Sequence, residues 1–193
     1  MNTLTLCRRA CGDPEIRRKF GGVFPSDVLP RRKCHFSLYV VNLDPQTKPG
    51  SHWIGIHFSN RIAYYFDSYG NVPTNANILS FLKRNSDRIM YNPACFQSKV
   101  TDTCGHYCLY FLHRRARHLK LTDLIESEKK KNERFITRFV TNRLKPSKCC
   151  HKRHAKRQSC KAWINMRSSN KPAQCSFKLS RDGTLRHRKD YRI

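Results

Sequence analysis

The side chains that could build a hydrophobic core lie almost entirely in the first 144 residues of this 193-residue chain. Residues 145–193 contain 15 Lys and Arg against two Asp, and only three aromatic residues. A segment this basic and this poor in apolar side chains cannot bury enough surface to offset the conformational entropy lost on folding. The sequence therefore predicts a loose basic arm over residues 1–20, one globular domain over 21–144 and a flexible basic tail over 145–193.

The net charge predicts contact with a polyanion. Lys and Arg number 39 against 13 Asp and Glu, which gives a formal charge of +26. An excess of this size favours nucleic acid, bound through its phosphates without regard to sequence. The run KCCHKRHAKR at 148–157 is equally typical of a nuclear localisation signal, and a solvated tail without a partner is the plainest alternative.

The tail also contains Cys and His residues, but their spacing differs from that of known zinc fingers, so the sequence predicts no metal site. These residues are Cys149, Cys150, His151, His154, Cys160 and Cys175.

The sequence lacks the apolar segments that are typical of membrane and secreted proteins. No apolar run approaches the roughly 18 residues that a membrane-spanning helix needs, and the first 20 residues lack the apolar stretch of a secretory signal. The ten cysteines are too sparse and too irregularly spaced for a disulfide scaffold. We therefore expect reduced thiols in an intracellular, monomeric protein that is not secreted and has no membrane partner.

Apolar and aromatic residues between positions 36 and 67 predict the central strands. Buried strands are expected over 36–42, 52–58 and 62–67, and a tight turn at 60–61 joins the last two as a hairpin. Residues 88–91 suggest a short edge strand. The Gly- and Pro-containing segment 21–34 predicts an ordered loop or extended chain.

Helical spacing of apolar residues predicts helices over 75–85, 104–118 and 132–144. Asp102 and Thr103 are suitable cap residues for the second helix, and Asn132 for the third. A mainly antiparallel sheet flanked by helices indicates the α+β class.

Four residues, His52, Asp67, Gln97 and Cys104, together offer the groups that a thiol protease needs. A thiol requires a base, the base requires an orienting carboxylate, and the oxyanion requires a donor. His52 begins one strand of the predicted hairpin and Asp67 ends the other, so both lie at one end of the sheet. Cys104 begins a predicted helix, whose dipole favours the thiolate. The Gln97 amide and the Cys104 N–H could then form an oxyanion hole.

Each of these residues, taken singly, also suits a structural role. A histidine at a strand start is usually packed or at the surface, and a cysteine on an apolar helix face is usually a small core residue. An aspartate before Ser-Tyr-Gly is typical of a turn. Only the combination of the four residue types, in this order and context, favours catalysis over these simpler interpretations.

The strings PGSHWIGIHF, YYFDSYG and CGHYCLYFL, with Gln97 seven residues before Cys104, resemble the adenovirus-type cysteine endopeptidases. The similarity is greatest to the protease of Polinton/Maverick elements and adintoviruses. It extends more widely to the cysteine proteases specific for SUMO and ubiquitin-like proteins. The resemblance covers about residues 18–143 and implies a papain-like, adenain-type α+β fold.

The resemblance also implies a role for each matching residue. His52 matches the general base, Asp67 the orienting acid, Gln97 the oxyanion donor and Cys104 the nucleophile. Five positions are expected to contact the substrate: Gly22, Val23, Phe24, Trp53 and Gly105.

Cleavage of protein substrates near glycine follows from the resemblance, with virion precursors as substrates and a nuclear or virion-associated location. No metal or other cofactor is required, although the adenoviral enzymes are stimulated by DNA and by a short peptide. Two alternatives stay open. One is a deconjugating protease for SUMO or ubiquitin-like proteins, and the other is a nucleic-acid-binding protein built on an inactive protease domain.

Overall fold

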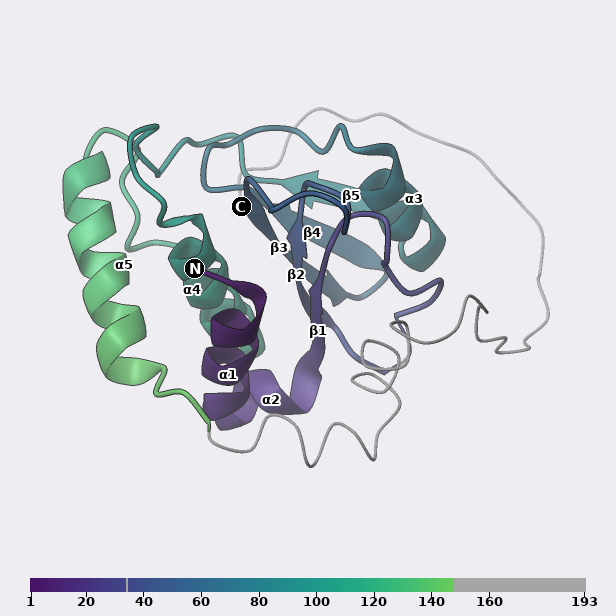
Figure 1. Ribbon diagram of the computed structural model, residues 1–193, viewed down its shortest axis with the longest axis horizontal. Helices are drawn as coiled ribbons and strands as arrows, with labels where there is room; N and C mark the ends of the chain where they lie inside the picture. The colour runs from purple at the N-terminus through teal and green to yellow at the C-terminus, as the bar shows by residue number, and fades with distance from the viewer. Residues whose placement is uncertain (34, 148–193) are drawn as a thin grey trace.

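The computed structural model describes residues 1–33 and 35–147, and within them five strands form one mixed sheet at the centre of the molecule (Figure 1). The strands follow each other across the sheet in their sequence order. All the strands predicted from the sequence are present, with small shifts at their ends, and the extended segment near residue 21 supplies one more. The strands are β1 (Phe20–Phe24), β2 (Leu38–Asn42), β3 (Trp53–Ser59), β4 (Ile62–Phe66) and β5 (Arg88–Tyr91).

Antiparallel pairs occupy the middle of the sheet, and parallel pairs form its two edges. Strand β3 is antiparallel to both β2 and β4, whereas β1 runs parallel to β2 and β5 runs parallel to β4. Asn60 and Arg61, with φ values of 48° and 61°, form the predicted tight turn between β3 and β4. The residue before β3 and the residue after β4 therefore lie at the same end of the sheet. The predicted α+β class is confirmed.

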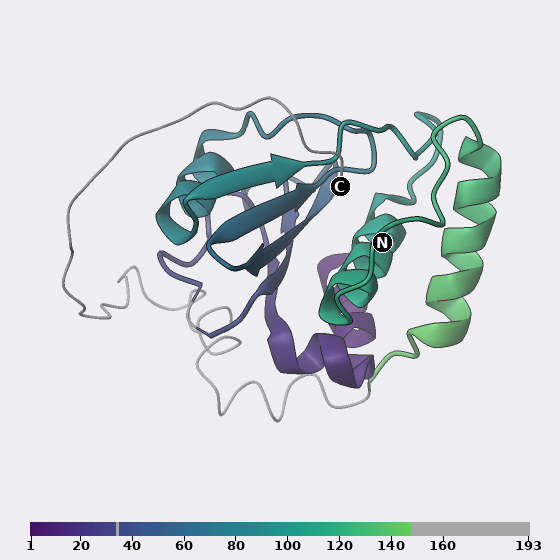
Figure 2. The ribbon, with the colours of Figure 1, turned by 180° about the vertical axis from the view of Figure 1, so that it is seen from behind.

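Helices cover both faces of this sheet. One face carries α1 (Thr3–Gly12), α2 (Pro14–Lys19), α4 (Cys104–Ala116) and α5 (Lys129–Arg143), with α4 between α5 and the sheet (Figures 1 and 2). The opposite face packs against α3 (Ala76–Asn85). Gly55 of β3 lets α4 approach closely, because a Cβ at this position would lie 2.6 Å from the Phe111 ring.

The loose arm expected over residues 1–20 is corrected by the structure, which shows α1 and α2 there. Leu6 and Ile16 are completely buried against the rest of the core. Side-chain oxygens of Asn2 and Asp13 cap the two helices. The apolar face is inconspicuous in the sequence because it is spread over two short helices and includes small side chains.

The start of the last predicted helix is also corrected. Helix α5 begins at Lys129, with Glu128 as its N-cap, whereas the sequence suggested Asn132 as the cap. Asn132 lies inside the helix, and its buried amide donates to the Ile125 carbonyl at 2.7 Å. Phe135 of the same helix is 40% exposed. Tertiary hydrogen bonds thus decide the place of an asparagine that local patterning assigns to a helix end.

The basic tail predicted over residues 145–193 falls almost wholly outside the described residues, so its loose character and the lack of a zinc site in it stay predictions. The last described residue contacts α1, because the Ser147 N–H donates to the Arg8 carbonyl at 2.9 Å. Within the part of the chain that the structure describes, no helix is long and apolar enough to cross a membrane.

Candidate active site

His52 and Asp67 meet at the end of the sheet, as the hairpin predicts. His52 immediately precedes β3 and Asp67 immediately follows β4. The His52 Nε2 lies 2.7 Å from the Asp67 Oδ1, and both side chains are buried. Because Nε2 is engaged by the carboxylate, the other ring nitrogen, Nδ1, is left for a second partner.

The Asp67 carboxylate is held by the chain around it. The Tyr69 N–H donates to Oδ1 at 2.8 Å, and the Asn71 Nδ2 donates to Oδ2 at 3.1 Å. The Asn92 side chain, just after β5, exchanges two hydrogen bonds with the Asp67 backbone, at 2.9 and 2.7 Å. These contacts fix the direction from which the carboxylate meets His52.

Cys104 is the second partner of His52. It is the first residue of α4, and Thr103 occupies the predicted cap position, although its side chain makes no capping hydrogen bond to the helix. Burial opposes ionisation of the thiol. The hydrogen bond to His52 and those from the Trp53 and Gly105 N–H groups outweigh it, so the pKa of Cys104 lies below its ordinary value.

The electrostatics of His52 complement those of the thiol. Burial disfavours the imidazolium, but hydrogen bonds to Asp67 and Cys104 outweigh burial and raise the pKa of His52 to about 9. A lowered thiol pKa beside a raised imidazole pKa favours a thiolate–imidazolium pair. Such a pair provides a nucleophile and a proton donor in the same place.

Tyr69 completes this cluster and was not singled out in the sequence. Its ring stacks on the His52 imidazole, with centroids 4.7 Å apart and an interplanar angle of 24°. The Asp-Ser-Tyr-Gly string was the available signal, but the stacking depends on the path of the turn after Asp67. Gly70 within this turn has a φ of 75°, a conformation that suits glycine.

Gln97 joins the cluster through Ser68 and Tyr69. The Ser68 Oγ donates to the Gln97 Oε1 at 2.6 Å. The Gln97 Nε2 donates to the Thr101 carbonyl at 2.6 Å and to the Tyr69 hydroxyl at 3.3 Å. The amide is therefore fixed in one orientation, and its partnership with the Cys104 N–H in an oxyanion hole stays a prediction.

Two of the predicted substrate positions lie beside Cys104 and contact the N-terminal segment. The Trp53 Nε1 donates to the Met1 carbonyl at 2.9 Å. A Cβ at Gly105 would lie 3.2 Å from both the Met1 Cβ and the Leu6 Cδ2. The lack of a side chain at Gly105 thus lets α1 pack closely against it. The Gly105 N–H also donates to the Cys104 thiol.

The three predicted substrate positions on β1 belong to the sheet. Gly22 has a φ of 138°, which favours glycine. Val23 packs in the core on the α4 side of the sheet and Phe24 in the core on the α3 side, and both are buried. Contact of these residues with a substrate stays a prediction.

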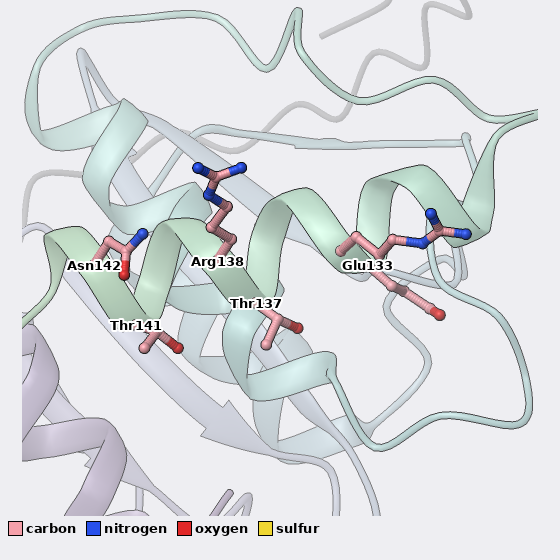
Figure 3. Close-up of a pocket in the computed structure, with 6 residues that line it drawn as sticks. Glu133, Thr137, Arg138, Thr141 and Asn142 are labelled. Carbon is pink, nitrogen blue, oxygen red and sulfur yellow. The ribbon is translucent and has the colours of Figure 1, made fainter.

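The described residues contain no group of three or more His, Cys, Asp or Glu side chains suited to a metal ion. A surface pocket of about 490 Å³ lies along α5, and its lining includes none of His52, Asp67, Gln97 and Cys104 (Figure 3). Polar side chains line it, with two arginines and one glutamate among them: Glu133, Arg134, Thr137, Arg138, Thr141 and Asn142.

Comparisons with known proteins add little at the level of sequence. No protein-family model matches the chain, and a search of curated proteins finds no match.

Among solved structures, the ASFV pS273R protease aligns with a TM-score of 0.49 and 16% identity, over 76% of this chain and 69% of that one. Its selenomethionine form aligns with a TM-score of 0.38 and 21% identity, over 58% and 46%. The C-terminal Ulp1 protease domain, solved in complex with Smt3, the yeast ortholog of SUMO, gives 0.35 and 18%, over 57% and 55%. The chain spans about half the length of two of these structures. At this level of similarity the assignment of the site depends on its own geometry.

Proposed function

We propose that this protein is a cysteine endopeptidase with Cys104 as nucleophile. The observation that carries the proposal is the continuous hydrogen-bonded line from Asp67 through His52 to Cys104. The described part of the chain places no metal-ligand cluster there, and the thiol–imidazole chemistry needs no cofactor.

The proposed reaction begins with attack of the Cys104 thiolate on the scissile carbonyl. The Gln97 Nε2 and the Cys104 N–H donate to the oxyanion. To do so, Gln97 gives up its hydrogen bond to the Tyr69 hydroxyl, which lies 3.3 Å from Nε2 without substrate. The His52 imidazolium protonates the leaving amine as the carbon–nitrogen bond breaks, and the neutral imidazole then takes a proton from water as that water attacks the thioester. The carbon–sulfur bond then breaks, which releases the acid product and restores the Cys104 thiolate beside the His52 imidazolium. Asp67 orients His52 and stabilises its charge throughout.

For the substrate, we propose protein chains with glycine near the scissile bond. The support is the sequence resemblance to adenovirus-type proteases, carried by the His52-Trp53, Asp67 to Gly70 and Gln97/Cys104 strings. Processing of virion precursors, in the nucleus or the virion, fits that resemblance. Removal of SUMO or a ubiquitin-like protein from a conjugate is the second candidate, because its cleavage sites also end in glycine.

Nucleic acid is the proposed polyanionic partner. The support is the exposed basic side of α5, where Arg134 and Arg138 are one turn apart and line the pocket in Figure 3. Two arginines with neighbouring threonine hydroxyls suit phosphate oxygens. Stimulation of the peptidase by DNA, or by a peptide, is a separate question that the same assays can address.

The test is cleavage of fluorogenic peptides by the wild type, Cys104→Ala and the control Cys7→Ala, with and without DNA. Cys7 is a partly buried thiol on α1. The panel contains Gly-Gly sequences, matched Ala-Ala sequences and a ubiquitin-like substrate with a folded domain. Cleavage that Cys104→Ala alone abolishes supports the proposal. Preference for the folded substrate favours deconjugation, and nucleic-acid binding with no cleavage by any form supports the inactive-domain alternative.

A further inference from the structure

A single carboxylate on α5 holds the loop that carries Gln97. The Glu133 Oε1 accepts a hydrogen bond from the Ser98 N–H at 2.8 Å and another from the Thr101 hydroxyl at 2.6 Å. Glu133 lies near the beginning of α5, at one end of the pocket in Figure 3. This glutamate therefore connects a surface helix to the loop that leads into Cys104.

The loop in turn sets the direction of the Gln97 amide. The Thr101 carbonyl accepts from the Gln97 Nε2 at 2.6 Å, while the Thr101 hydroxyl is held by Glu133. At the other end of the amide, the Ser68 hydroxyl donates to Oε1 at 2.6 Å. Loss of the Glu133 contacts would leave the Thr101 hydroxyl with the Ser98 carbonyl as its acceptor and would loosen Thr101, which is one of the three residues, with Ser68 and Tyr69, that hydrogen-bond the Gln97 side chain.

Asn132, which precedes Glu133 in α5, contacts the residue on the other side of Gln97. The Asn132 Nδ2 lies 3.3 Å from the Phe96 carbonyl, and Asn132 is almost completely buried. Asn132 and Glu133 thus contact the residues immediately before and after Gln97. Two successive polar residues of α5 therefore hold the same short loop by hydrogen bonds.

We propose that Glu133 is a positioning residue for the oxyanion donor Gln97. The inference rests on the proposed peptidase function and extends it to a residue of α5, outside the Asp67–His52–Cys104 line. A donor that must lie about 3 Å from a developing oxyanion loses much of its effect when it is displaced or turned away. Glu133 acts on the rate of acylation through this placement, without touching the reacting atoms.

The experiment compares Glu133→Ala, Glu133→Gln and Thr101→Val with the control Glu128→Ala. Glu128 is a glutamate of the same helix end that pairs with Lys131. We expect Glu133→Ala and Thr101→Val to lower kcat by roughly tenfold to a hundredfold, with KM within about twofold of wild type. Glu133→Gln keeps an acceptor oxygen and recovers most of the loss. The double variant of Glu133 and Thr101 loses little more than Glu133→Ala alone, because the hydrogen bond to Glu133 that Thr101→Val removes is one of the two that Glu133→Ala removes.

Alkylation of Cys104 by iodoacetamide separates positioning from collapse of the site. The rate of alkylation and its pH dependence report the thiolate–imidazolium pair, to which Glu133 does not contribute, so both stay as in the wild type. Loss of alkylation together with activity in Glu133→Ala, or an unchanged kcat in a folded Glu133→Ala, would overturn the inference. A wild type without peptidase activity would overturn the proposed function as well, which distinguishes the two failures.

Discussion

Replacement of Asp67 by asparagine should lower the pH above which activity is lost. Asp67 meets the His52 Nε2 at 2.7 Å and stabilises the imidazolium, whose pKa is raised to about 9. Relative to an ordinary histidine, this rise corresponds to about 3 kcal/mol in favour of the charged ring. Asparagine keeps the size and the polar contacts of the side chain but removes the negative charge.

The size of the effect follows from the surroundings of His52. Burial is the largest influence on the ring, it opposes protonation, and it is unchanged in Asp67→Asn. Without the negative charge of Asp67, the opposition to burial comes mainly from Cys104, and we expect the pKa of His52 to fall below about 7. At about pH 8 the protonated fraction then drops from roughly nine-tenths to less than one-tenth. The peptidase activity falls at least about tenfold from this cause alone.

The assay is the pH dependence of kcat/KM for wild type, Asp67→Asn and the control Asp87→Asn. Asp87 pairs at the protein surface with Arg61 in the turn between β3 and β4, at the opposite end of these strands from His52 and Asp67. We expect the alkaline limb near about pH 9 in the wild type and the control, and a limb at least about two pH units lower in Asp67→Asn. An alkaline limb that stays near pH 9 in a folded Asp67→Asn protein would refute this account of His52.

Three further predictions concern other parts of the molecule. Burial lowers the pKa of His57 to about 3 and that of His106 to about 4, so both take up protons near pH 6.5 only when unfolded. These two histidines should therefore make the free energy of unfolding fall as the pH drops from about 6.5 toward 4, and equal urea midpoints at about pH 7 and pH 5 would contradict this. Leu6→Ala empties a fully buried position in α1 and should lower the free energy of unfolding in urea by about 2–5 kcal/mol, whereas a loose arm predicts no change. Arg134→Gln combined with Arg138→Gln should reduce the log–log salt slope of nucleic-acid binding by about 1.8, and an unchanged slope would place the contact elsewhere.

The sequence predicts those parts of the site that follow from regular structure. The pairing of His52 with Asp67 depends only on an antiparallel hairpin with a short turn, and strand patterning is sufficient to predict both. The place of Cys104 follows similarly from the start of an apolar helix. These features are local, so periodicity and turn residues reveal them.

The remaining parts depend on loops and distant contacts that patterning does not encode. Tyr69 covers His52 because of the turn after Asp67, and Glu133 reaches the Gln97 loop from a helix more than thirty residues away in sequence. The burial of α1 depends on a few apolar residues, such as Leu6, that find their partners only in the folded chain. Asn132 shows the same limit, since its buried hydrogen bonds override its value as a helix cap.

Covalent labelling by a peptide inhibitor identifies the nucleophile. The reagent is a peptidyl vinyl sulfone that ends in glycine, and the readout is intact mass followed by peptide mapping. The account predicts one adduct, on Cys104, formed rapidly by the wild type and lost in both Cys104→Ala and His52→Ala. No adduct, or adducts spread over other thiols such as Cys7 and Cys95 at similar rates, would contradict a peptidase with Cys104 as its nucleophile.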